Sequence, residues 1–145
     1  MKVAASIALT LSTLLLSPLT VLAAEQQTEK ALIIVNSGSL QTQGMAMVLG
    51  NALQQEGTQV YLLLCDRAGD LALSETANEP LKPRSVTPEQ LMLKLQQGGA
   101  SVNVCALYLP NSDHDKAALR EGVGVATPKA IAQQMASADT RVFSF

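Results

Sequence analysis

Two cysteines are the side chains of this sequence best suited to covalent chemistry. Cys65 and Cys105 each lie toward the end of an apolar run. A cysteine is a nucleophile only as thiolate, which requires some exposure and a nearby cation or helix N-terminus. Lys116, Arg120 and a helix beginning near Ser112 are the candidates to supply that charge to Cys105. Two alternatives remain open, in which the cysteines pack as small apolar side chains or pair as a disulfide.

The spacing before each cysteine predicts that both point to one face of a sheet. The pattern Leu-Gln-Gln-x-Gly-x-x-Val ends at Val60 and again at Val102, as expected of two similar helix-to-strand turns. Cys65 lies five residues after the first valine and Cys105 three after the second, and both offsets are odd. A first strand placed between the two would separate the cysteines by roughly 9.5 Å, too far for a disulfide.

Other polar motifs lack the partners that a cofactor or metal site needs. The loop 36–39 (Asn-Ser-Gly-Ser) has neither the lysine of a phosphate-binding loop nor the spacing of a dinucleotide fingerprint. His114, the single histidine, lies between two aspartates in what we expect to be a solvated helix turn. Met45 fits the apolar face of a helix and is expected to pack in the core. We therefore predict no metal and no cofactor.

Composition excludes some classes of partner. The chain has 145 residues, a formal net charge of −2 and only 3% aromatic residues. Without a basic excess, binding of nucleic acid through phosphate contacts is not expected. The length is that of one domain.

Short apolar runs alternate with helical patterns along the chain. Uninterrupted apolar runs are typical of strands buried on both faces. Strands are predicted at 31–35, 59–65, 101–109 and 141–145, with a fifth near 122–126. Helices are predicted over Met45–Glu56, from Thr87 to about Gln97, over Ser112–Arg120 and from Thr127 to Ala138. The alternation predicts an α/β fold, a three-layer α/β/α sandwich around a mostly parallel sheet of four or five strands.

The first 23 residues have the three parts of a cleavable secretory signal peptide. Lys2 precedes the apolar segment 3–16, and Ser17-Pro18 ends it before a small-residue cleavage site at Ala23. We therefore expect residues 1–23 to be removed, leaving a domain over 24–145. A periplasmic or secreted location follows, with no membrane anchor after cleavage.

The mature chain resembles the DsrE/DsrF-like proteins, which include sulfur-relay subunits. The resemblance rests on the strand 31–36, the Gly/Ser/Gln loop and helix 45–56, then on the segments 57–69 and 98–105. It implies a Rossmann-like sandwich, a homo-oligomer and, at the position of Cys105, a cysteine that carries a persulfide. It also implies a partner that carries a thiol or sulfur.

Two functions follow as expectations. In the first, an exported DsrE-like protein handles sulfur or thiols through Cys105, with Cys65 as a second thiol and an activity like that of a sulfur carrier or sulfurtransferase. In the second, the same fold is a non-catalytic binding or assembly module with structural cysteines.

Overall fold

The computed structural model describes residues 30–145. The predicted signal peptide lies outside this range. Within it, no helix is long and apolar enough to cross a membrane.

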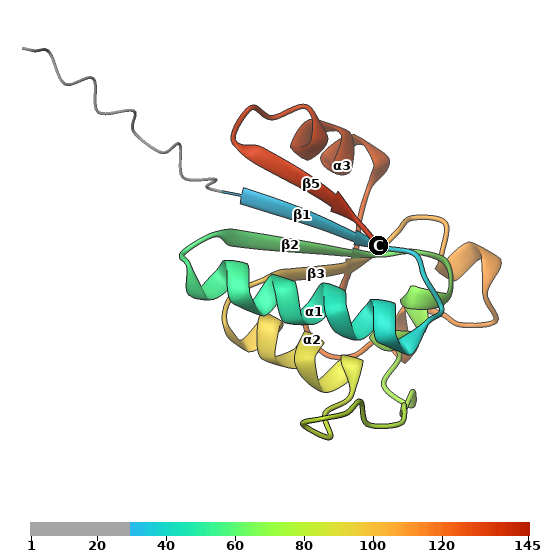
Figure 1. The fold of residues 1–145 in the computed structure, drawn as a ribbon. Helices are drawn as coiled ribbons and strands as arrows, with labels where there is room; N and C mark the ends of the chain where they lie inside the picture. Colours follow the sequence, from blue (N-terminus) through green and yellow to red (C-terminus); the bar gives the residue numbers. More distant parts are fainter. Residues whose placement is uncertain (1–29) are drawn as a thin grey trace, which may run out of the picture.

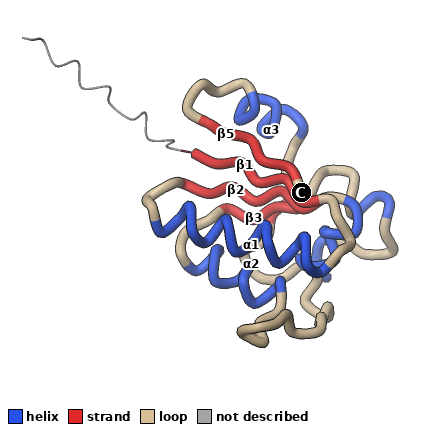
Figure 2. The backbone as a smooth tube through the Cα atoms, viewed as in Figure 1, coloured by secondary structure: helices blue, strands red, loops and turns tan. Residues whose placement is uncertain are grey.

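The five strands form one parallel sheet, which confirms the predicted α/β class. Spatial order is β4-β3-β2-β1-β5, with every neighbouring pair parallel. Figures 1 and 2 show two helices on one face of the sheet and one on the other. The elements are β1 (Lys30–Val35), α1 (Leu40–Gln55), β2 (Gln59–Leu64), α2 (Pro88–Gln97), β3 (Ser101–Val104), β4 (Gly124–Val125), α3 (Pro128–Met135) and β5 (Thr140–Ser144). The fifth strand predicted near 122–126 is thus β4.

The face of the sheet under α1 and α2 carries the main core. Alternate residues of β2, namely Val60, Leu62 and Leu64, point to this face and are at most 1% exposed. Met47 from α1 and Leu95 from α2 close the same cluster with no exposed surface. Burial of such side chains is the main favourable contribution to folding, at about 25 cal/mol per Å² of apolar surface.

The opposite face has a thinner cover. Its cluster contains Leu32, Leu63 and Ala126, with Ile131 of α3 packed against it. The helix predicted from Thr127 to Ala138 ends at Met135, which is 52% exposed, and α3 has no buried residue. An eight-residue helix spans too little of a five-stranded sheet to seal it.

The apolar face predicted for α1 points outward. Met45, Val48 and Leu49 are 54%, 49% and 43% exposed, so the expectation that Met45 packs in the core is wrong. Small residues allow α1 to lie close to the sheet and to α2. A Cβ atom at Gly50 would lie 3.1 Å from side-chain atoms of both Ile33 and Leu95.

Local signals fix the starts of α2 and α3 where the sequence predicted them. Thr87 caps α2 in a complete capping box with Gln90, and Thr127 caps α3. The repeated Leu-Gln-Gln turns share one geometry, since Thr58 and Ala100 each donate a backbone hydrogen bond to the leucine that begins the pattern. Their glycines, Gly57 and Gly99, have φ of +86° and +97°, which only glycine adopts readily. Ser39 caps α1 so that it begins at Leu40, earlier than expected.

Candidate functional site

Cys65 and Cys105 lie side by side at the carboxyl edge of the sheet. Each directly follows its strand, and Leu64 pairs with Val104 in the residue before. The Cys105 N–H donates to the Leu64 carbonyl oxygen at 2.8 Å, which sets the two cysteines level. Neighbouring strands are about 4.8 Å apart, within the Cα separation that a disulfide spans. In the structure both cysteines are free thiols.

The arrangement in which β1 separates the two cysteine strands is wrong, because β2 lies between β1 and β3. Strand β3 is also shorter than predicted, ending at Val104 and not at Leu109. The segment after Cys105 forms turns, and some of its apolar residues pack on the main core while Leu107 is 71% exposed. The packed residues include Tyr108, which is 7% exposed.

Both cysteines face α3, as the odd spacing from their valines predicted. Each packs against the smaller cluster of Leu32, Leu63 and Ala126, and Cys105 also touches the main core. Neither residue is fully buried. The two sulfurs therefore lie on the thinly covered face of the sheet.

The environment of Cys65 holds it as a neutral thiol. Burial, a hydrogen bond with the Cys105 side chain, and the charges of Cys105 and Asp66 raise the pKa of Cys65 to about 12. At neutral pH, Cys65 can donate a hydrogen bond but is a poor nucleophile.

The prediction of a helix over Ser112–Arg120 is wrong. Two short 3-10 turns, Leu109–Asn111 and Lys116–Ala118, replace it. The segment has no apolar periodicity that a helix could bury against the core. The Arg120 side chain donates to the carbonyl oxygens of Leu71 and Thr76 at 3.0 and 2.6 Å, so it braces a neighbouring loop.

A different helix begins next to the cysteines. The Ala126 N–H donates to the Val104 carbonyl oxygen at 2.9 Å, which places Ala126 level with Cys105 on the adjoining strand. Thr127 then caps α3. The positive end of a helix dipole favours nearby negative charge. The helix start that the sequence placed near Ser112 is instead found at Thr127, directly after the residue that is level with Cys105.

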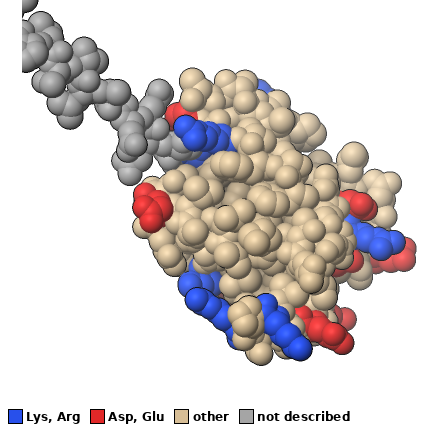
Figure 3. Space-filling model, in the orientation of Figure 1, with Lys and Arg blue, Asp and Glu red and all other residues tan. Residues whose placement is uncertain are grey.

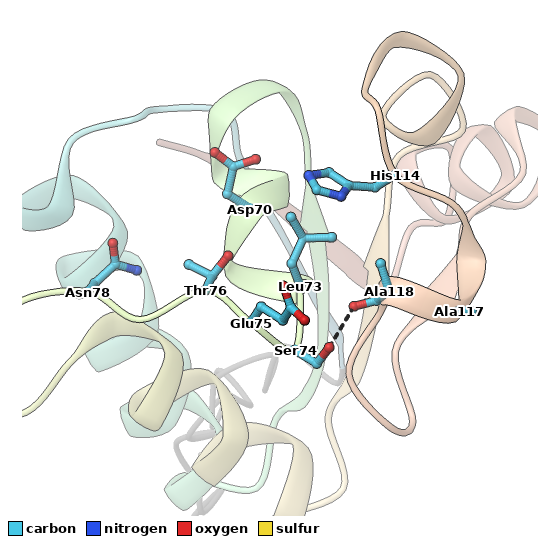
Figure 4. Close-up of a pocket in the computed structure, with 9 residues that line it drawn as sticks. All are labelled: Asp70, Leu73, Ser74, Glu75, Thr76, Asn78, His114, Ala117 and Ala118. Atoms are coloured by element: carbon cyan, nitrogen blue, oxygen red, sulfur yellow. Dashed lines mark hydrogen bonds between the residues drawn. The ribbon is translucent and has the colours of Figure 1, made fainter.

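A cavity of about 560 Å³ at the same edge brings together polar residues that the sequence did not connect. Asp70 and His114 both line this cavity, and Figure 4 shows that they come from two different segments of the chain. The Tyr108 hydroxyl donates to Asp70 at 2.7 Å. Burial and this carboxylate raise the pKa of Tyr108. His114 was expected in a solvated helix turn, and no sequence signal placed it beside Asp70. Within residues 30–145, no group of three or more His, Cys, Asp or Glu side chains could hold a metal ion.

Comparison with solved structures identifies the fold. The chain is similar to the ychN protein from E. coli, at 23% identity and a TM-score of 0.65 over 81% of this chain and 99% of that one. It is also similar to MTH1491 from Methanobacterium thermoautotrophicum, a protein of unknown function. That match has 11% identity and a TM-score of 0.59, over 80% and 98% of the two chains.

These matches define the class of protein at the level of the fold. Both neighbours have the DsrE/DsrF-like fold, so the resemblance drawn from the sequence is supported at that level. No family model matches the chain, and no curated protein matches it.

Proposed function

We propose that this is an exported protein that handles sulfur or thiols, with Cys105 as the nucleophile and Cys65 as a second thiol. The observation that carries the proposal is the pairing of two incompletely buried thiols at the carboxyl edge of a parallel sheet. Ligand sites in open α/β sheets lie at this edge. The DsrE-like fold and the position of Cys105 in the sequence resemblance support the same function.

The reaction is the transfer of a sulfane sulfur. The Cys105 thiolate attacks the outer sulfur of a persulfide donor, RSSH, and the donor S–S bond breaks. RSH leaves with the proton that Cys105 gave up, and Cys105 becomes a persulfide. The start of α3 lies beside the sulfur that carries negative charge, and Cys65, kept as a thiol, can donate a hydrogen bond to it. A partner thiol would accept the sulfur by the same exchange.

Glutathione persulfide, followed by mass spectrometry of the native protein, tests this reaction. We expect a mass gain of one sulfur atom on Cys105. Cys105→Ser should abolish the gain, and the matched variant Cys65→Ser should retain it. Circular dichroism establishes that both variants are folded.

The alternative is a binding or assembly module in which the cysteines only pack. Both cysteines do contact apolar clusters, which is the observation that favours it. If neither cysteine of the folded protein accepts sulfur or reacts with iodoacetamide, the sulfur-handling proposal fails and this alternative stands.

Export is a separate part of the proposal and has its own test. The apolar segment before Ala23 supports it. Intact-mass analysis of the protein expressed with its full sequence in a Gram-negative host should show a chain that begins at Ala24 in the periplasmic fraction. A full-length chain in the cytoplasmic fraction would contradict it.

A further inference from the structure

An apolar groove of about 850 Å³ runs beside the outer surface of α1, far in sequence from either cysteine. It lies between α1, the loop that precedes α2, and the first turns of α2. Its apolar lining comprises Met45, Val48, Pro80, Leu81, Pro83, Val86 and Leu91. The volume is within the range of about 300–1,000 Å³ that small-molecule sites occupy.

The groove continues the outward apolar face of α1. Met45, Val48 and Leu49 are spaced as one helical stripe, yet each is more than 40% exposed. Such a stripe normally faces a core. Contiguous exposed apolar surface on a soluble protein marks a binding site.

Three cations line the same groove. They are Lys82, Arg84 and Lys94, and no carboxylate lines it among the described residues. Within the described range, the side chains of these three residues form no hydrogen bond or ion pair. Figure 3 shows basic side chains gathered along the lower edge of this view, over α2 and the loop before it, with acidic ones beyond. The protein as a whole has a net charge of −2, so this concentration of positive charge is local.

We propose that the groove binds a single-chain anionic amphiphile, a long-chain carboxylate. The apolar floor fits the hydrocarbon chain, and the three cations complement the head group. Met45 has an unbranched, adaptable side chain that suits a flexible ligand. A second copy of this chain is a less suitable occupant of the groove. Docking through the same patch about a two-fold axis would bring the two sets of cations toward each other, and like charges repel. The site is distinct from the proposed sulfur chemistry, since no cysteine lines the groove.

Fluorescence of cis-parinarate, a polyene fatty acid, measures binding directly, and unlabelled laurate competes for the site. We expect saturable binding at one site and displacement by laurate. Dodecyltrimethylammonium, a cation with the same chain length, should not displace the probe. Val48→Asp should abolish binding because it places a carboxylate on the apolar floor.

Charge reversal separates specific binding from general attraction. The double variant Arg84→Glu/Lys94→Glu should weaken binding about tenfold or more, about 1.4 kcal/mol or more. The matched control Lys129→Glu/Arg141→Glu makes the same change in net charge at exposed positions outside the groove and should bind normally. Equal loss in both double variants, or equal displacement by the cationic amphiphile, overturns the proposal. Sedimentation without fatty acid gives a further test. A dimer that the Val48→Asp substitution dissociates would also overturn the proposal, because a second copy of the chain would then occupy the groove.

Discussion

The two faces of the sheet differ in how completely they are covered. The face under α1 and α2 holds a continuous core of side chains that are almost all inaccessible to solvent. On the other face, α3 is short and contributes no buried residue, while Val142 of β5, which pairs with Leu32, is 41% exposed. Stability is therefore concentrated on one side of the molecule, and the incompletely buried cysteines pack against the smaller cluster on the other.

The cysteines lie at the carboxyl edge of the sheet, where the cover of the α3 face ends. Strands β1 and β2 are buried on both faces near their centres, as Leu32 and Leu63 show on the α3 side. Toward the carboxyl edge that cover ends, and Cys65 and Cys105 are left incompletely buried. A thiol here has rigid strand backbone behind it and an incomplete layer in front, which is what a reactive sulfur on a fixed scaffold needs.

Truncation of one aliphatic side chain on each face is the strongest test of the difference. Leu62→Ala removes a side chain buried in the main core and should cost about 3 kcal/mol of unfolding free energy. Ile34→Ala acts on the α3 face, where the side chain is only partly buried, and should cost about 1 kcal/mol. Urea denaturation of both variants measures the two values. Equal losses would mean that the two faces contribute equally.

Overpacking the edge of the covered face should cost less than emptying its centre. A Cβ atom at Gly69 would collide with the Tyr108 ring, so Gly69→Ala must displace it, at a cost of about 2 kcal/mol. The ring would then leave Asp70, and the pKa of Tyr108 should fall back toward its ordinary value. Ultraviolet titration of the phenol follows this change. An unchanged titration would show that Tyr108 keeps its contact.

Loss of the helix caps should give the next smaller effect, again larger on the covered side. Thr87→Ala removes the side-chain part of the α2 capping box, in which the Thr87 hydroxyl accepts from the Gln90 N–H, and should cost about 1 kcal/mol. Thr127→Ala removes a single hydrogen bond at the exposed start of α3 and should cost about 0.5 kcal/mol. Thermal denaturation of the two variants provides the comparison. A larger loss for Thr127→Ala would show that α3 matters more than its burial indicates.

The sequence predicted the elements whose signals are local. The capping threonines, the two glycine turns and the apolar strands β1, β2 and β5 lie within a residue or two of the expected places. In each case short-range hydrogen bonding or backbone conformation decides the structure. The segment after Cys105 failed because its apolar residues pack as turns against distant parts of the chain, and no short-range pattern reveals this.

Strand order and helix orientation required information that the sequence pattern does not hold. The choice of α1 face depends on small residues such as Gly50 fitting against Ile33 and Leu95, and an apolar stripe alone predicted the wrong side. The adjacency of Cys65 and Cys105 follows from β2 lying between β1 and β3. Their common face could be read from spacing, whereas their proximity could not.

The last expected effect concerns the pH dependence of stability. The environment in the folded protein raises the pKa of Cys65 from its ordinary value of 9.0 to about 12, so folding favours its neutral form. Its contribution is fully present below pH 9 and is lost progressively as the pH rises from 9 to 12, because the unfolded chain releases the proton first. Urea midpoints between pH 8 and 10.5 should therefore fall more steeply for the wild type than for Cys65→Ala. Tyr108 also loses its proton in the alkaline range, but it is present in both proteins and cancels in the difference. Parallel curves would place Cys65 in an environment as open as solvent, and the contrast between the two thiols would then disappear.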